Sequence, residues 1–195
     1  MVAAQHEIGG KNRILEAARN LFNLRGFHQT SIAELATGAQ VSVGQIYRLF
    51  KGKEDIINAI VEANSDDRCR EIAELSQRLH IGEIDVERTF ELLLLSFIDK
   101  HDEALSFDIL AEGFRNSNVG DSISMMCARF RQLIKDFAQG ANPRLSGDVL
   151  AGAEEMILAC MFGLGHRSLS RPDLDAETAA SITARMIIAA LRAMD

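Results

Sequence analysis

Residues 30–53 read TSIAELATGAQVSVGQIYRLFKGK, which gives two short helical segments joined by a tight turn. The first segment, residues 31–39, starts with Ser31 and has Glu34 three residues later, the spacing of a capping box. The second segment, residues 42–49, repeats this spacing with Ser42 and Gln45, and basic residues follow it. This layout predicts a helix-turn-helix, whose second helix lies in the major groove of DNA.

The outward-facing side chains of the second segment are of types that contact DNA. A glutamine can pair with adenine, a valine can meet a thymine methyl, and tyrosine or arginine can bond phosphates. Gln45 also has a rival role, because a capping box would fold its side chain back to Ser42. The predicted DNA-binding residues are Thr30, Ser31, Ser42, Val43, Gly44, Gln45, Tyr47, Arg48, Lys51 and Lys53.

The charge of the chain is divided unevenly along its length. The whole chain has a formal net charge of −7, which by itself argues against a nucleic-acid partner. Residues 1–53, however, carry seven basic and three acidic side chains, whereas the rest carries 14 basic and 25 acidic ones. A segment of charge +4 on a body of charge −11 can attract phosphates while the body stays away from them. Chance scatter of surface charge is the alternative.

The spacing of apolar residues predicts an all-α protein of about nine helices without strands. We expect residues 1–54 to form a three-helix DNA-binding domain and residues 55–195 a helical domain for effector binding and dimerisation. Gly26 and Gln40 are expected to end helices, Gln40 at a modest strain cost if its φ is positive. The expected helices span residues 11–25, 31–39, 42–49, 53–79, 85–100, 102–115, 121–139, 147–168 and 175–194.

Residues 11–60 contain ILEAARNLFNLRGF, TSIAELA and VSVGQIYRLFKGKEDII, and this run resembles the TetR family of transcriptional regulators. The family pattern is roughly V-S-x-G-T-L-Y-x-x-F-x-x-K-E, and its places are taken here by Val41, Ser42, Gly44, Tyr47, Phe50, Lys53 and Glu54. The chain departs from the pattern at Gln40, Val43 and Gln45. The resemblance implies an all-helical homodimer that binds palindromic operator DNA and usually represses. It also implies a C-terminal domain that binds a small inducer and a dimer interface made by the last two helices.

The middle helices are rich in large apolar side chains, which can line a cavity for an apolar or aromatic effector. A packed core is the alternative for each of them. Asp108 and Glu112, one helical turn apart, could meet a cationic ligand or simply form a solvated face. The candidate pocket residues are Leu94, Phe97, Phe107, Leu110, Phe114, Met126, Phe130, Phe137 and Met161.

The last two helices combine many alanines and glycines with more apolar residues than one buried face needs. Small residues let helices approach closely, so we predict that these helices form the homodimer interface, with Ala159 and Ala184 as candidate contacts. Packing within one chain is the alternative.

Other classes of protein fit the sequence poorly. Three widely spaced cysteines suggest neither a disulfide framework nor a zinc site, and no motif for a metal, a cofactor or a catalytic centre is present. The sequence has neither an apolar run long enough for a membrane span nor a secretory signal, which favours the cytoplasm. We therefore predict a ligand-responsive, dimeric repressor. The alternative is a DNA-binding protein without a small-molecule effector, controlled by a protein partner or acting architecturally.

Overall fold

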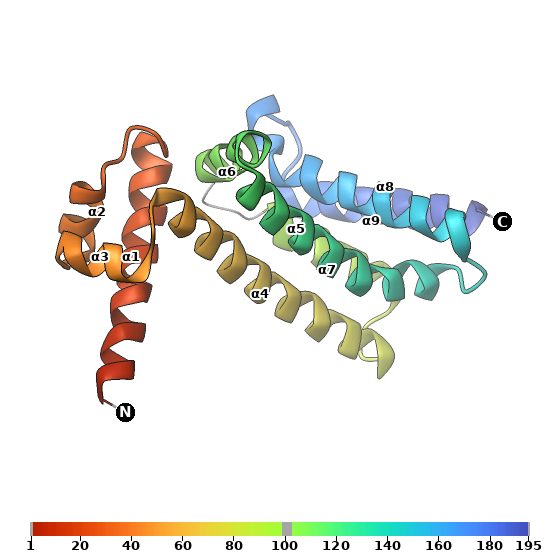
Figure 1. Ribbon diagram of the computed structural model, residues 1–195. Helices are drawn as coiled ribbons and strands as arrows, with labels where there is room; N and C mark the ends of the chain where they lie inside the picture. Colours follow the sequence, from red (N-terminus) through yellow and green to blue (C-terminus); the bar gives the residue numbers. More distant parts are fainter. Residues whose placement is uncertain (1, 99–102, 195) are drawn as a thin grey trace. The chain divides into compact units, whose positions relative to one another are not determined.

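The computed structural model describes residues 2–98 and 103–194, with the backbone alone for residues 2–8 and 103. These residues form nine α-helices and one 3-10 turn and contain no strand, which confirms the all-α prediction (Figure 1). Lys100 and Asp102, the predicted end and start of two helices, lie outside the described residues. The elements are α1 (Val2–Arg25), α2 (Ile32–Ala39), α3 (Val43–Leu49), α4 (Lys53–His80), α5 (Val86–Ile98), α6 (Glu103–Arg115), α7 (Ser117–Ala141), α8 (Gly147–Gly165), η1 (Arg167–Ser170) and α9 (Ala176–Ala193).

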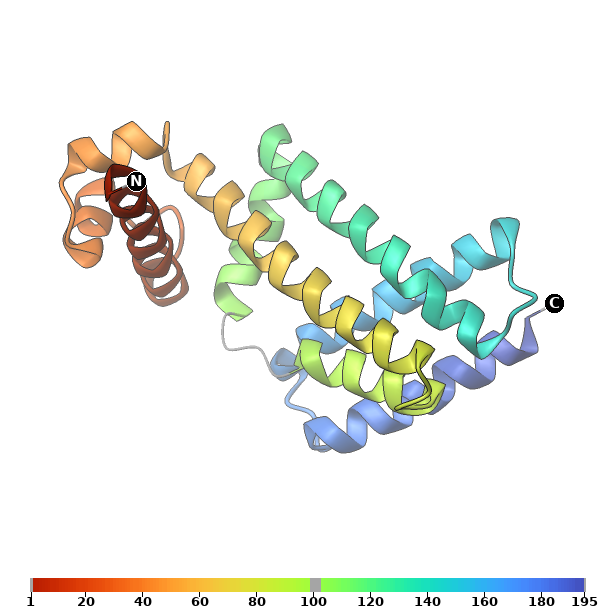
Figure 2. The ribbon, with the colours of Figure 1, turned by 90° about the horizontal axis from the view of Figure 1, so that it is seen from below.

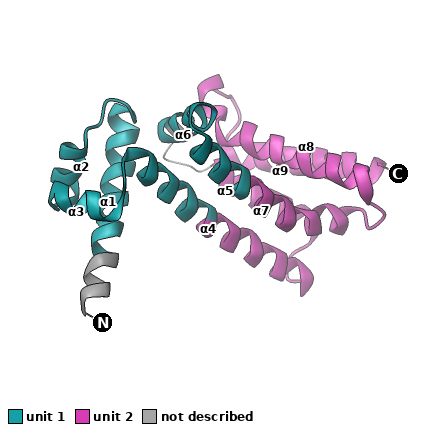
Figure 3. Cartoon of the chain, viewed as in Figure 1, with its two compact units in different colours: residues 1–65, 102–126 teal, residues 66–101, 127–195 magenta. Residues whose placement is uncertain are grey.

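The helices belong to two compact units, coloured separately in Figure 3. Unit 1 contains α1, α2, α3, the part of α4 up to Ser65, α6, and α7 up to Met126. Unit 2 contains the rest of α4 and α7 together with α5, α8 and α9. The helix-turn-helix therefore shares its compact unit with α6, which lies some 70 residues further along the chain.

The core of unit 1 is built from helices that are distant in sequence. On α1, Ile14, Ala18 and Phe22 recur at helical spacing and are fully buried. They belong to one apolar cluster with Leu35 of α2 and Ile46 of α3. The same cluster includes buried residues of α4, α6 and α7, namely Ile56, Ile57, Ile60, Leu105, Ile109 and Val119.

Unit 2 is organised around α5, which packs against both α8 and α9 (Figure 2). Its sequence is apolar on most sides, and Phe90, Leu93 and Leu94 are fully buried. Edge-to-face ring contacts extend this core: the centroids of Phe90 and Phe137 lie 6.2 Å apart. The C-terminal end of α9 is closed by buried Asn142, whose amide donates to Leu191 O at 2.9 Å and Met194 O at 2.8 Å.

Two helix ends in the DNA-binding motif have a left-handed backbone, which the sequence predicts for Gly26. Gly26 follows α1 with a φ of 84°, and Gln40 follows α2 with a φ of 53°. Gln40 is not a glycine, so this turn carries a conformational cost, which hydrogen bonds from its N–H and from Val41 N to the end of α2 help to offset.

Candidate nucleic-acid interface

The first helix of the motif begins with the predicted capping box. Glu34 N donates to Ser31 Oγ at 3.2 Å, and Ser31 N donates to Glu34 Oε2 at 2.8 Å. The Ser31 backbone N–H, and after it the Ser31 hydroxyl, lower the pKa of Glu34, so this carboxylate stays charged at neutral pH. Arg25 adds an ion pair to Glu34 at 2.5 Å, which ties the end of α1 to the start of α2.

The second helix, α3, is anchored by one face and exposes the other. Ile46 is fully buried beneath it, and the Ser42 hydroxyl caps it by accepting from Gln45 N at 3.1 Å. On the opposite side Val43, Gly44 and Arg48 are exposed, and Tyr47 is 58% exposed. The structure thus brings four of the predicted DNA-contacting residues together on one accessible face of α3.

The Gln45 side chain does not form the capping bond that was one of the two roles expected from the sequence. Although its backbone N–H bonds Ser42, the described residues show no bond from its side chain back to the Ser42 N–H. Its amide instead lies against α1: a Cβ added at Gly10 would come within 2.6 Å of Gln45 Nε2. The absence of a side chain at Gly10 thus leaves room for this amide, and reading of a base by Gln45 stays a prediction.

We expect Gln45→Ala to change the preferred base at one position of the bound DNA, by about 1–3 kcal/mol. The measurement is fluorescence anisotropy on a set of single-base variants of a bound duplex. Gln132→Ala, at an exposed position of α7, is the matched control and should leave the preference unchanged. A lower melting temperature with an unaltered base preference would assign Gln45 to packing against α1.

Thr30 lies inside the motif instead of facing outward. Its side chain is 1% exposed, and its hydroxyl donates to Gly26 O at 3.0 Å. The physical reason is that carbonyl groups at the end of a helix and just after it lack helical partners, and the hydroxyl of Thr30, four residues on, can reach that of Gly26. The side chain of Thr30 therefore serves the 26–31 loop between α1 and α2, whereas its neighbour Ser31 is exposed.

The two lysines after α3 are placed differently from each other. Lys51 is exposed, and its backbone N–H donates to Asp55 Oδ2 at 2.8 Å. Lys53 Nζ donates to Phe27 O at 2.8 Å, to Thr30 O at 2.8 Å and to His28 O at 3.3 Å. It also stands 4.8 Å from the centroid of the Phe27 ring. The ammonium group expected at a DNA phosphate thus binds the 26–31 loop in this structure.

Two carboxylates of α6 lie against the same loop, and one of them, Asp108, is bonded to it. Asp108 Oδ2 accepts from Phe27 N at 2.7 Å, and Glu112 Oε2 lies 3.5 Å from His28 Nε2. Glu112 is buried, and within the described part of the chain this oxygen has no hydrogen-bond partner. The sequence offered a cation site or a solvated face for this pair. The sequence did not predict the bond from Phe27 to Asp108, because these residues are 81 positions apart and the local sequence pattern gives no sign of such a contact.

The nine candidate pocket residues are distributed over both compact units. Leu94, Phe97, Phe130, Phe137 and Met161 lie buried in unit 2, where the ring centroids of Phe97 and Phe130 are 6.1 Å apart. In unit 1, Leu110 is partly buried, Met126 packs against the core, Phe107 is exposed, and Phe114 is 95% exposed. A pocket does exist in unit 2, between α5 and α9, but none of the nine lines it.

No helix in the described ranges is both long and apolar enough to span a bilayer.

The capped helix-turn-helix near the start of the chain and the helices that follow it place this protein among the all-helical proteins with an N-terminal helix-turn-helix. Within this class, residues 14–60 match the family model described as bacterial regulatory proteins, tetR family. The helix-turn-helix segment of this chain therefore belongs to that family.

Individual transcriptional regulators resemble this chain in sequence or in fold. The HTH-type transcriptional regulator UidR of Escherichia coli (strain K12) is 32% identical over 109 residues, which cover 56% of this chain and 54% of UidR. The chain thus spans about half the length of the curated relatives it matches first. Salmonella enterica GusR shares its fold, with a TM-score of 0.69 at 22% identity over 93% of this chain and 94% of GusR. The transcriptional regulator FadR from Bacillus subtilis in complex with stearoyl-CoA also shares this fold. Its TM-score is 0.73 at 16% identity, over 90% of this chain and 96% of FadR.

Proposed function

We propose that this protein is a ligand-responsive transcriptional repressor that binds palindromic operator DNA as a homodimer. The observation that carries the proposal is the face of α3, where Val43, Gly44, Tyr47 and Arg48 are exposed together above buried Ile46. A short helix anchored by one apolar residue and capped at its N-terminus is suited to enter the major groove. Family membership supports DNA as its partner.

The surfaces of α8 and α9 support dimerisation. On α9, Met186, Ala189 and Ala193 form an exposed apolar stripe at helical spacing, in which Met186 is 67% exposed. On α8, Gly152, Ala159 and Gly163 are exposed on one side. A Cβ at either glycine would meet nothing within 4 Å, so packing within the chain does not require glycine there. Glycine costs a helix about 1 kcal/mol relative to alanine, and close approach of a second copy would explain its use.

Ala184 does not belong to this surface. It is 0% exposed and lies in the core of unit 2 on the inner side of α9. The sequence placed it with Ala159 because both are small residues in the last two helices, but only Ala159 is accessible to a partner. The proposed interface is therefore narrower than the sequence suggested.

An apolar or aromatic effector is supported by a structural neighbour, since FadR of Bacillus subtilis has the same fold and was solved with stearoyl-CoA. The alternative, a DNA-binding protein without a small-molecule effector, predicts that no compound stabilises the chain. A screen of small molecules for a raised melting temperature separates the two, because a ligand that binds only the folded state stabilises it.

Selection of duplexes from a random pool tests the proposal directly. We expect the recovered sites to be two-fold symmetric, with half-sites one turn of DNA or a multiple of it apart. Binding should weaken steeply with salt, with a slope of about −0.9 per phosphate contact in a log–log plot. Recovery of asymmetric single sites, or a slope near zero, would contradict the dimeric, groove-binding mode.

A further inference from the structure

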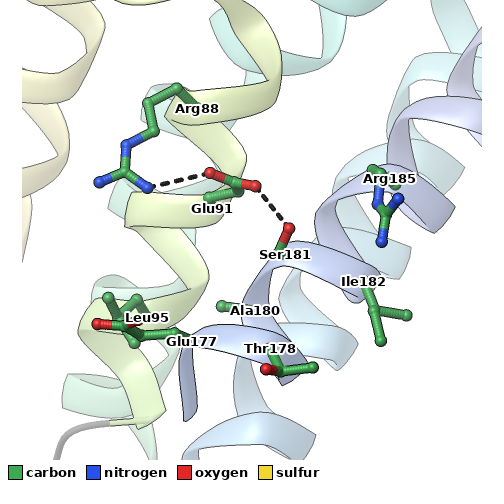
Figure 4. Close-up of a pocket in the computed structure, with 9 residues that line it drawn as sticks. All are labelled: Arg88, Glu91, Leu95, Glu177, Thr178, Ala180, Ser181, Ile182 and Arg185. Atoms are coloured by element: carbon green, nitrogen blue, oxygen red, sulfur yellow. Dashed lines mark hydrogen bonds and ion pairs between the residues drawn. The ribbon is translucent and has the colours of Figure 1, made fainter. Parts of the chain in front are cut away.

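A pocket of about 450 Å³ lies in unit 2 between α5 and α9 (Figure 4). This volume falls within the range of about 300–1,000 Å³ that small-molecule sites occupy. The apolar part of its lining comes from Leu95 on α5 and from Ala180 and Ile182 on α9. The rest of the lining is charged or carries hydroxyl groups, so the pocket offers an amphiphilic surface.

One of the lining carboxylates is already engaged by two partners within the protein. Glu91 Oε1 accepts from Ser181 Oγ at 2.7 Å, and Glu91 Oε2 accepts from Arg88 Nη1 at 3.1 Å, as Figure 4 shows. The Ser181 hydroxyl, and after it Arg88, lower the pKa of Glu91, so it stays charged and remains bound to both partners at neutral pH. Glu91 therefore fixes α5 against α9 and has little charge left to offer a ligand.

The other two lining charges are not equivalent. Glu177 lies in the first turn of α9, where the helix macrodipole stabilises a negative charge. Arg185 lies in the middle of α9, is exposed, and has no hydrogen bond or ion pair among the described residues. The positions three and four residues away from it hold Ser181, Ile182, Ile188 and Ala189, so no acidic neighbour on the helix compensates it. Among the described residues, Arg185 is thus the lining cation of the pocket that has no carboxylate partner, whereas Arg88 is paired with Glu91.

We propose that the α5–α9 pocket binds a small organic anion, whose acidic group pairs with Arg185 and whose short apolar part lies against Leu95, Ala180 and Ile182. A guanidinium can grip a carboxylate through two parallel hydrogen bonds, which gives orientation as well as attraction. Arg88 donates from Nη1 to Glu91 and adds positive potential at the same pocket. The proposal deepens the proposed function by giving the effector a chemical class and a site, and it rests on the ligand-responsive part of that function.

The test uses the whole chain of 195 residues without DNA, so that a failure to bind the ligand can be told apart from a failure to bind operator DNA. Amide ¹H–¹⁵N spectra are recorded during titration with hexanoate and, in parallel, with hexan-1-ol, a neutral probe of the same chain length. We expect hexanoate to shift amides of α5 and α9 around the pocket and to bind at least about tenfold more tightly than hexan-1-ol, a difference of about 1.4 kcal/mol.

Arg185→Gln should raise the dissociation constant for hexanoate at least about tenfold without lowering the melting temperature, because the side chain is exposed. Arg192→Gln, which changes another exposed arginine of α9 outside the pocket, is the matched control and should bind hexanoate like the wild type. Absence of shifts with hexanoate, equal affinity for hexan-1-ol, shifts confined to other helices, or unchanged binding in Arg185→Gln would each overturn the proposal.

Discussion

Ala159→Arg is expected to convert the protein into a monomer and to lower its affinity for a palindromic duplex by about 10²–10⁴-fold. Ala159 is exposed on α8, on the side where Gly152 and Gly163 leave the helix without side chains. A guanidinium inserted between two closely packed helices would lose its water without gaining a partner. Each monomer would then bind a half-site alone, without the gain from simultaneous engagement of two. Sedimentation velocity and anisotropy on the duplex measure the two effects.

Two further variants make this result specific. Ala128→Arg adds the same charge at an exposed alanine of α7 and should remain dimeric with normal affinity. Ala184→Arg buries the charge inside unit 2, so it should lower helix content and thermal stability, unlike Ala159→Arg. If Ala159→Arg stays dimeric and binds the palindrome as tightly as the wild type, the proposed contact on α8 is wrong.

Lys53→Met is expected to lower the free energy of unfolding by about 2 kcal/mol, or the melting temperature by about 4–8 °C. The reason is that three carbonyl oxygens of the 26–31 loop lose the ammonium group that binds them. The salt dependence of DNA binding should keep its slope, because the charge is directed at the loop. Thermal unfolding and a series of binding isotherms at different salt concentrations provide the measurements.

Lys51→Met is the matched control, because Lys51 lies two residues before Lys53 in the segment that joins α3 to α4. The side chain of Lys51 is exposed, and its contact with Asp55 is made by the backbone N–H. Loss of the side chain should therefore leave stability unchanged and reduce the salt slope by about 0.9. The reverse pattern, with a reduced slope and full stability in Lys53→Met, would mean that Lys53 leaves the loop for a phosphate when DNA binds.

The parts of the structure that depend on neighbouring residues could be predicted from the sequence. The capping box of Ser31 and Glu34 and the left-handed stop at Gly26 each involve residues within four positions of one another. Helix spacing likewise predicted the buried face of α1, because periodicity places Ile14 and Phe22 on one side.

Contacts between distant segments could not be predicted in the same way. Asp108 and Phe27 meet across 81 positions, and the side chain of Gln45 lies near Gly10 because of how α1 and α3 pack. Composition identifies large apolar residues but not whether they surround a space, so Phe97 and Phe130 were candidates for a cavity and form a ring contact. The α5–α9 pocket was missed because its lining is mixed, with Arg185 and Glu91 giving no distinctive motif.

The 26–31 loop has a consequence for digestion by proteases. Connecting loops are normally cut first, because a protease must draw an extended segment into its active site. Here Asp108 holds the N–H of Phe27, Lys53 holds three carbonyl oxygens, and the ring of Phe27 is buried. Chymotrypsin, which cleaves after aromatic residues, would have to break these bonds before it could reach Phe27. The bond after Phe27 should therefore survive limited digestion of the wild type and become an early cleavage point in Lys53→Met.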